Sequence, residues 1–516
     1  MVRLGIDVGG TNTDAVLLDR AELLAWAKHP TTPDVSSGIV GAVRAVLARA
    51  RVAPADVGAV MLGTTHFTNA VVQRRELARI GVLRLALPAT TSIPPLEDWP
   101  DELREAVAGY LEILPGGHQF DGREISPLDR EALARAASRI VQEGIETVAV
   151  SAVFSPAIPD HEEAVTRFLA ERMPGLRITR SHEIGRIGLL ERENAAALNA
   201  CLVPLAERTL RAIESALAEL GLEAPLYLTQ NDGTLMTAEF AARYPVPTFS
   251  SGPTNSMRGA AFLSGLRDAI VLDVGGTTTD AGALVHGFPR EASFAVSVGG
   301  VRTNFRMPDV VSIGLGGGSL VRADGAAVGP ESVGYRLTEE AFVFVGSTLT
   351  ATDIAVAAGR ARLGDPRRVA SLPRELVRRA LATIDRRLSE LVDSLKTTAA
   401  AVPVVVVGGG HILVPDQLEG ASEVIRPPSA AVANAIGAAI AQVSGEIDRI
   451  VSLEAQTRES ALAAAEADAR RAAVAAGAHP ASIEIVEIEE IPLAYLPSNA
   501  VRLRVKAVGN LREGRA

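Results

Sequence analysis

Two short stretches of the chain combine carboxylates, glycines and hydroxyls in the same order. The first is Asp7-Val8-Gly9-Gly10-Thr11-Asn12-Thr13-Asp14, and the second, roughly half the chain later, is Asp273-Val274-Gly275-Gly276-Thr277-Thr278-Thr279-Asp280. Each begins at the end of an apolar run that predicts a buried strand. Two glycines let the backbone turn tightly beside a ligand, and the N–H groups and hydroxyls of such a turn can hold phosphate. The repeat indicates an internal duplication that builds one site from two facing halves.

Other predicted strands also end in polar residues or glycines. Strand 57–62 is followed by Gly63-Thr64-Thr65-His66, and strand 226–228 by Thr229-Gln230-Asn231. Ligands of α/β proteins usually bind at such carboxyl ends, although Thr64 and Thr65 would serve equally well as caps of the helix that follows. Strand 403–407 runs directly into Gly408-Gly409-Gly410, on which the base and ribose of a nucleotide could pack flat.

Two further segments allow more than one interpretation. The run Gly314-Leu315-Gly316-Gly317-Gly318 either closes over a phosphate or is a flexible turn between strands. The segment Asp160-His161-Glu162-Glu163 looks like a metal cluster, but Pro159 before it and the apolar periodicity after it favour the charged first turn of a helix. The glycines at 408–410 lack the full G-x-G-x-x-G pattern, which excludes a Rossmann dinucleotide site.

Strands and helices alternate through much of the chain, which predicts an α/β fold. We expect three units: residues 1–187, residues 188–450 and a small α+β appendage at residues 451–516. Proline-rich and glycine-rich turns near residues 88–128 indicate an inserted loop and helix at the edge of the first unit. The appendage, with a predicted helix and two strands, carries no motif with chemistry of its own.

The composition excludes several classes of protein. A formal net charge of −10 argues against nucleic acid or an anionic membrane as a partner. No apolar run is long enough to span a bilayer and no signal peptide precedes the first strand, so we expect a soluble cytoplasmic protein. The single cysteine, Cys201, excludes an intrachain disulfide and a cysteine-rich zinc site, and we interpret it as a buried structural thiol.

Together these motifs resemble the actin, Hsp70 and sugar-kinase superfamily of ATP-binding folds, and within it the hydantoinase A and 5-oxoprolinase family. That family also includes subunits of ATP-dependent acetone and acetophenone carboxylases. The resemblance implies an α/β fold of two duplicated actin-like ATPase lobes, each ribonuclease H-like, around a central cleft. The segments that carry it stand in family order, at residues 5–19, 63–69, 155–162, 191–204, 251–259, 273–280 and 314–319.

One segment departs from the family pattern. Members usually show glycine-glycine-alanine-glycine-proline-leucine-histidine late in the chain, where this chain has Val407-Gly408-Gly409-Gly410-His411-Ile412-Leu413. The extra C-terminal domain of the longer members is also not expected here. The chain is therefore similar to the short subgroup, whose substrate does not follow from the better-known members.

The resemblance implies ATP and Mg²⁺ as cofactors. Asp7 and Asp273 would hold the Mg²⁺, partly through water, and with Thr11 and Thr277 they are the candidate catalytic residues. Asp14 and Asp280 would orient the turns. The remaining candidates for binding the nucleotide are Gly9, Gly10, Thr13, Gly275, Gly276, Thr278, Gly316, Gly317, Gly408, Gly409 and Gly410. The candidates for the substrate side of the cleft are Thr64, Thr65, His66 and Asn231.

The chemistry implied by the resemblance is activation of a carbonyl that water attacks poorly. Phosphorylating an amide oxygen turns it into a leaving group, and such a step needs positioning and charge stabilisation rather than a covalent nucleophile. We therefore expect an ATP-dependent hydrolase that opens a cyclic amide, such as a hydantoin or a lactam, in an oligomer that could include a hydantoinase B-type subunit. The alternatives are a subunit of an ATP-dependent ketone carboxylase and an actin-like, nucleotide-dependent interaction protein.

Overall fold

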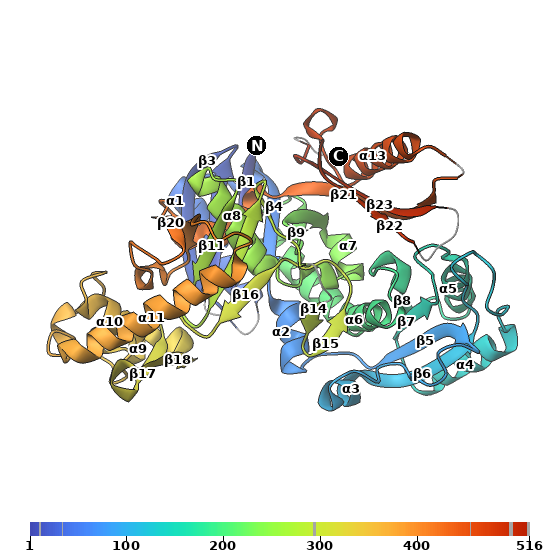
Figure 1. Cartoon of the computed structure of the whole chain (residues 1–516), viewed down its shortest axis with the longest axis horizontal. Coiled ribbons are helices and arrows are strands. Elements are labelled where there is room, and N and C mark those ends of the chain that lie inside the picture. Colours follow the sequence, from blue (N-terminus) through green and yellow to red (C-terminus); the bar gives the residue numbers. More distant parts are fainter. Residues whose placement is uncertain (10–11, 33–34, 293–295, 455, 495–498, 513–516) are drawn as a thin grey trace.

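The computed structural model describes residues 1–9, 12–32, 35–292, 296–454, 456–494 and 499–512 (Figure 1). Within these ranges the largest sheet has nine strands, in the order β22-β23-β21-β10-β9-β4-β1-β2-β3. The N-terminal part supplies β1 (Val2–Val8), β2 (Asn12–Asp19), β3 (Glu22–Pro30) and β4 (Val57–Thr64). Later parts of the chain supply β9 (Leu226–Thr229), β10 (Thr234–Thr237), β21 (Gln442–Ser452), β22 (Glu484–Pro492) and β23 (Ala500–Gly509).

A second sheet repeats the arrangement of the first around the second motif. Strand β11 (Ala269–Val274) pairs antiparallel with β12 (Thr279–Val285) and parallel with β19 (Val402–Val407), as β1 pairs with β2 and β4. The register places Asp7 opposite Asp14 and Asp273 opposite Asp280. The duplication predicted from the sequence is therefore present in the backbone. The sheet is completed by β13 (Phe288–Pro289), β16 (Val310–Ile313) and β20 (Ala421–Ile425).

Two helices that approach each other closely at glycines join the sheets. They are α8 (Ser251–Ser264) and α12 (Ala433–Ile440). A Cβ atom added to Gly259 would lie 1.9 Å from the carbonyl oxygen of Ala433, and one added to Gly437 would lie 1.8 Å from that of Asn255. Only glycine permits such a close approach of two backbones. The close packing predicted for the alanine-rich segment 428–443 is confirmed, although the helix is shorter.

A separate sheet of four parallel strands lies in the region between β4 and β9. Its order is β6-β5-β7-β8, with β5 (Ile80–Leu87), β6 (Ala108–Pro115), β7 (Thr147–Ala152) and β8 (Arg177–Arg180). The segment 88–128 was expected to hold only a loop and a helix, but it contains α3 (Asp101–Val107) and the whole of β6. Strand β6 is at the edge of the sheet and half-buried along most of its length, so its sequence shows no apolar alternation.

Most of the other helices flank these sheets (Figure 1). These other helices are α1 (Ser36–Ala50), α2 (His66–Gln73), α4 (Arg130–Gln142), α5 (Asp160–Arg172), α6 (Leu189–Glu219), α7 (Ala238–Arg243), α9 (Leu337–Glu340), α10 (Ala351–Ala357), α11 (Arg374–Leu395) and α13 (Arg458–Ala475). Two small hairpins are formed by β14 (Val296–Val298) with β15 (Val301–Thr303) and by β17 (Ser319–Arg322) with β18 (Ala327–Ser332). Helices α9 and α10 lie beside the β17–β18 hairpin (Figure 1). No helix in the described part of the chain combines the length and the apolar character needed to cross a membrane.

The final strands extend the first sheet. Figure 1 shows β21 running out of this sheet to β22 and β23, with α13 packed against them. Strand β4 pairs with β9 across the limit expected at residue 187. Strand β21 runs through residue 450 and pairs with β23, across the other expected limit. The division of the chain into three units therefore stays a prediction.

Candidate active site

The first carboxylate of the site is at the end of β1. Asp7 is almost fully buried, and its Oδ2 accepts a hydrogen bond of 2.8 Å from the amide nitrogen of Asn434 on α12. The neighbouring strand end comes very close, since a Cβ added to Gly63 would lie 2.6 Å from Asp7 Oδ1. Opposite Asp7 on β2, the buried Asp14 accepts a hydrogen bond of 2.7 Å from Lys28 Nζ. Helix α12 and the end of β4 thus fix the carboxylate of Asp7.

The second carboxylate is held in the same way from the other sheet. Asp273 ends β11, and its Oδ2 accepts a hydrogen bond of 2.5 Å from the hydroxyl of Ser256 on α8. The glycine run after β19 packs against it, because a Cβ on Gly408 would lie 2.3 Å from Asp273 Oδ1. Gly408 also has a φ of +85°, which a residue with a side chain rarely adopts. A glycine at 408 is required on both counts.

The electrostatics of the site favour a cation. Burial raises the pKa of Asp7 to about 7, and the charges of Asp14 and Asp273 add to the effect. Burial raises the pKa of Asp273 to about 6 against the hydrogen bond from Ser256. The pKa values of Asp14 and Asp280 are also raised by burial. Four carboxylates that are costly to ionise together are stabilised by a divalent metal ion.

Two buried oxygens add to this donor set. Asp14 Oδ1 and the amide oxygen of Asn255, on α8, have no hydrogen-bond partner among the described residues. Mg²⁺ prefers oxygen ligands and retains part of its water shell. The residues present therefore fit a magnesium ion held by Asp7 and Asp273.

The two glycine turns close identically. Gly9 N–H donates to the carbonyl of Asn12 at 3.0 Å, and Gly275 N–H donates to that of Thr278 at 2.9 Å. These two N–H groups are used inside the turns, so they are not available to a phosphate as predicted. Within the described chain, the N–H groups of Gly276 and Thr277 donate to no protein acceptor, and the side chains of Thr277 and Thr278 are exposed. Gly10 and Thr11 lie outside the described residues.

The glycine run at residues 314–318 packs against the second turn and forms hydrogen bonds with it. Gly317 N–H donates to the carbonyl of Gly275 at 3.0 Å, and Gly318 N–H donates to that of Gly276 at 2.7 Å. A Cβ on Gly316 would lie 2.6 Å from the backbone nitrogen of Thr277. The run was expected either to close over a phosphate or to be a flexible turn between strands. In the structure the N–H groups of Gly317 and Gly318 are bonded to the second turn, so the run supports that turn.

The glycines after β19 divide into two that pack and one that is open. Gly410 N–H donates to the carbonyl of Val274 at 2.7 Å, and Gly408 packs against Asp273. A Cβ on Gly409 would meet no described atom within 4 Å. The open backbone surface beside the second turn is thus at Gly409.

Several predicted contact residues have structural partners instead. Thr13 is fully buried, and its hydroxyl lies 3.3 Å from that of Thr31, which turns it away from solvent. Thr64 is buried, and its hydroxyl accepts a hydrogen bond of 3.1 Å from the N–H of His66, the first residue of α2. The Asn231 amide nitrogen donates to the carbonyl of Arg306 at 2.6 Å. These three side chains are buried and bonded within the protein, and the sequence pattern could not reveal their burial.

The residues left at the open end of β4 are Thr65 and His66. Both are half-buried, and the Thr65 hydroxyl accepts a hydrogen bond of 3.3 Å from Asn69. Burial lowers the pKa of His66, so its imidazole is neutral near pH 7. Their role toward a substrate stays a prediction.

Three polar residues of the site were missing from the predicted set. They are Asn255, Ser256 and Asn434, which hydrogen-bond or face the carboxylates from α8 and α12. Asn434 is a single amide in an alanine-rich helix, and such an isolated polar residue on an apolar helix is a signal that could have found it.

The chain is similar to known proteins over much of its length. A family model described as the hydantoinase/oxoprolinase N-terminal region matches residues 3–173, and one described as hydantoinase/oxoprolinase matches residues 192–402. The alpha subunit of caprolactamase from Pseudomonas jessenii is 27% identical over 389 residues, covering 69% of this chain and 54% of that protein. The gamma subunit of acetophenone carboxylase from Aromatoleum aromaticum is 28% identical over 391 residues, covering 69% and 53%. The matched region thus spans about half the length of these relatives.

Two solved structures share the fold. The ATP-dependent caprolactamase of Pseudomonas jessenii superposes with a TM-score of 0.77 at 20% identity, over 99% of this chain and 88% of that one. Nucleotide-free acetone carboxylase superposes with a TM-score of 0.69 at 18% identity, over 100% and 88%. The α/β fold of duplicated actin-like lobes predicted from the sequence is confirmed. On the two family matches, the chain belongs to the hydantoinase/oxoprolinase family.

Proposed function

We propose that this chain is an ATP-dependent hydrolase that activates the carbonyl of a cyclic amide for ring opening. The observation that carries the proposal is a pair of carboxylates, the buried Asp7 and the half-buried Asp273, at equivalent positions of two hairpins. They are close enough for the charge of Asp273 to raise the pKa of Asp7. The relatives named as an ATP-dependent caprolactamase and a 5-oxoprolinase support a lactam as the class of substrate.

In this proposal the residues of the site have three roles: holding the metal ion, binding phosphate and receiving the nucleoside. Asp7 and Asp273 hold Mg²⁺, while Asn434 and Ser256 fix the orientation of the two carboxylates. The N–H groups of Gly276 and Thr277 and the exposed hydroxyls of Thr277 and Thr278 contact phosphate oxygens. The open backbone at Gly409 receives the base or ribose. When bound, ATP with its Mg²⁺ supplies the phosphoryl group that converts the amide oxygen into a leaving group.

The proposal is tested by following ATP consumption with Mg²⁺ across a panel of hydantoins, lactams and ketones, each with and without bicarbonate. We expect stimulation by a cyclic amide that is independent of bicarbonate. The same panel is run with a hydantoinase B-type subunit, because the relatives in this family include subunits of larger enzymes. No stimulation by any cyclic amide under either condition would contradict the proposal.

A ketone carboxylase subunit is the second candidate. It is favoured by the similarity to the acetophenone carboxylase gamma subunit and by the fold shared with acetone carboxylase. In that case ATP consumption would need both a ketone and bicarbonate. The panel therefore separates the two functions by which additions are required.

Replacing Gly276 by alanine tests the phosphate turn without disturbing the fold. A Cβ there meets no described atom within 4 Å, and the backbone is not in the left-handed region, so we expect an unchanged melting temperature. The methyl group would lie where a phosphate approaches, and ATP affinity should fall by at least about tenfold, the equivalent of roughly 1.4 kcal/mol. Calorimetric titration with ATP and Mg²⁺ measures the effect.

The matched control is Gly175→Ala, which also adds a methyl group in open space with ordinary backbone angles. It should change neither stability nor ATP affinity. Equal ATP affinity of the Gly276→Ala variant and the wild-type chain would show that no phosphate lies at this turn.

A further inference from the structure

Outside the two-turn site, two histidines and a glutamate converge at the edge of the four-stranded sheet. His118 follows β6, His161 is in the first turn of α5 after β7, and Glu124 lies across a short hairpin from His118. All four strands are parallel, so the segments after β6 and β7 meet at the carboxyl edge, where ligands of such sheets bind. The fold therefore brings together His118 and His161, which are 43 positions apart in the sequence.

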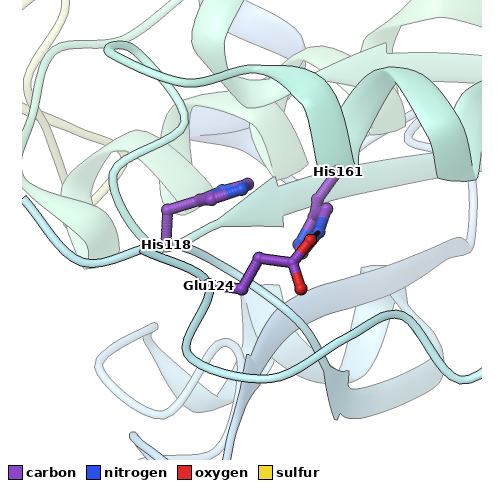
Figure 2. A group of neighbouring side chains, drawn as sticks. All are labelled: His118, Glu124 and His161. Carbon is purple, nitrogen blue, oxygen red and sulfur yellow. Dashed lines mark hydrogen bonds and ion pairs between the residues drawn. The ribbon is translucent and has the colours of Figure 1, made fainter. Parts of the chain in front are cut away.

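The three side chains offer ligand atoms to a common point. One nitrogen of each imidazole and one carboxylate oxygen of Glu124 lie within 4.8 Å of one another. His161 Nε2 is 3.3 Å from Glu124 Oε1, and the two imidazole ring centres are 4.3 Å apart. Figure 2 shows the ring of His118 extending toward His161, with the carboxylate of Glu124 beside the His161 imidazole.

The burial of His118 is the observation that points to a ligand. Only 4% of this residue is exposed, and its buried Nδ1 has no hydrogen-bond partner among the described residues. A buried ring nitrogen without a partner is costly, and metal coordination is one way to satisfy it. Burial and the neighbouring His161 lower the pKa of His118, which favours the neutral imidazole that a metal needs.

We propose that His118, Glu124 and His161 form a binding site for a zinc ion. Two histidines and one glutamate are an established zinc ligand set, and with only three protein ligands the fourth tetrahedral position is left to water. Nitrogen and oxygen ligands bound at about 2.0–2.1 Å lie about 3.4 Å apart. His161 Nε2 and Glu124 Oε1 already have this spacing, and the ligand nitrogen of His118 lies within 4.8 Å of the other two ligand atoms.

Metal binding must compete with one existing hydrogen bond. Gly117 N–H donates to His161 Nδ1 at 2.9 Å, which places the imidazole proton on Nε2, facing Glu124. A zinc ion bound at Nε2 takes the place of that proton, which moves to Nδ1 in the neutral imidazole, so the hydrogen bond from Gly117 N–H is lost. The rival state is a metal-free contact between His161 and Glu124, and the experiment distinguishes the two.

The segment Asp160-His161-Glu162-Glu163 forms the first turn of α5 after Pro159, as the sequence predicts. Two residues of this turn are nevertheless buried, His161 and Glu162. Glu162 accepts hydrogen bonds from Ala152 N–H and the Ser181 hydroxyl and contacts His182. The carboxylate of Glu162 is therefore occupied by these hydrogen bonds. The proposed ligands are His161 and two residues of the hairpin after β6, His118 and Glu124.

The test uses tag-free chain stripped with a chelator and titrated with zinc by calorimetry. We expect one zinc per chain and a rise in melting temperature. Loss of even an outer-shell partner costs metal sites about 10- to 100-fold in affinity, so His118→Ala and His161→Ala should each lose more than about 100-fold. Cobalt in place of zinc should give the absorption of a tetrahedral site.

Controls separate the site from unspecific binding and from misfolding. His479→Ala and Glu171→Gln change exposed residues of the same types and should retain full zinc affinity. Glu124 is half-exposed, so Glu124→Gln should keep the wild-type circular dichroism and still bind zinc more weakly. No stoichiometric zinc in the wild-type chain, or wild-type affinity in Glu124→Gln and the histidine variants, would overturn the proposal in favour of the metal-free pair.

Discussion

Replacing Asp7 or Asp273 by asparagine is expected to lower ATP turnover by about 10²- to 10³-fold and, at the same time, to stabilise the chain at pH 8 without magnesium. Each change removes a carboxylate assigned to Mg²⁺ but keeps an oxygen for Asn434 or Ser256 to bond. Loss of one electrostatic contact to a transition state typically costs about 10²- to 10³-fold in turnover. A steady-state ATPase assay at saturating Mg²⁺ measures this loss.

The gain in stability follows from the sign of the pKa changes. Burial raises the pKa of Asp7 to about 7 and that of Asp273 to about 6, from 3.8. A group whose pKa is raised on folding stabilises the folded state below about pH 4, and this contribution is lost as the pH rises through 6 to 7. At pH 8 the wild-type chain carries the full penalty of the buried charges, of the order of a few kcal/mol, which each asparagine variant relieves.

Denaturant unfolding at pH 4 and pH 8 tests this expectation. The variants should match the wild-type chain at pH 4 and exceed it at pH 8, while added Mg²⁺ should stabilise the wild-type chain more than either variant. Asp416→Asn removes a carboxylate that is 96% exposed and should change stability by less than about 0.5 kcal/mol. A variant that keeps turnover, or one that gains nothing at pH 8, would argue against a metal site built from these carboxylates.

The repeated motif could be predicted because its chemistry is local. Each copy needs an apolar strand, a carboxylate at the strand end and two glycines, and all of these stand within a dozen residues. The register of Asp7 with Asp14 and of Asp273 with Asp280 follows from a tight hairpin of fixed length. Family, fold class and the two carboxylates could therefore be inferred from the amino-acid sequence alone.

The rest of the site depends on contacts that no local pattern encodes. Asn434 reaches Asp7 across more than four hundred positions, through the crossing of α12 and α8 at Gly437 and Gly259. The use of the Gly9 and Gly275 N–H groups inside their turns is likewise decided by backbone closure. Composition and spacing identify candidate residues, whereas packing decides which of their atoms remain open to a ligand.

The same limit applies to the convergence of His118 and His161. Each residue alone has an ordinary interpretation, as a loop residue or as part of a first helical turn. They meet because β6 and β7 flank β5 in one parallel sheet, and β6 was the strand that the sequence did not predict. Because this edge strand was not predicted, the cluster of His118, Glu124 and His161 could not be predicted either.

Replacing Glu193 by glutamine is expected to cost about 3–5 kcal/mol of stability, as for other buried ion pairs that lose one partner. Arg84 and Glu193 are both 1% exposed and form two hydrogen bonds, Nε to Oε2 at 2.8 Å and Nη2 to Oε1 at 2.5 Å. The Ser151 hydroxyl donates to the same carboxylate at 2.6 Å. Glutamine would present an NH₂ group to these donors and leave the guanidinium charge uncompensated.

The pair joins β5 and β7 to the long helix α6, so its loss should loosen the four-stranded sheet rather than the two-turn site. Guanidinium chloride unfolding measures the change, with Glu390→Gln as the control, since the Arg386–Glu390 pair is exposed and contributes about 0.3–0.5 kcal/mol at most. The double variant Arg84→Met/Glu193→Leu removes both charges while keeping apolar volume, and it should recover most of the loss. Two results would contradict this explanation: a loss of less than about 1 kcal/mol in Glu193→Gln, or a double variant less stable than Glu193→Gln. Either would show that an unpaired buried charge is not the cause of the destabilisation.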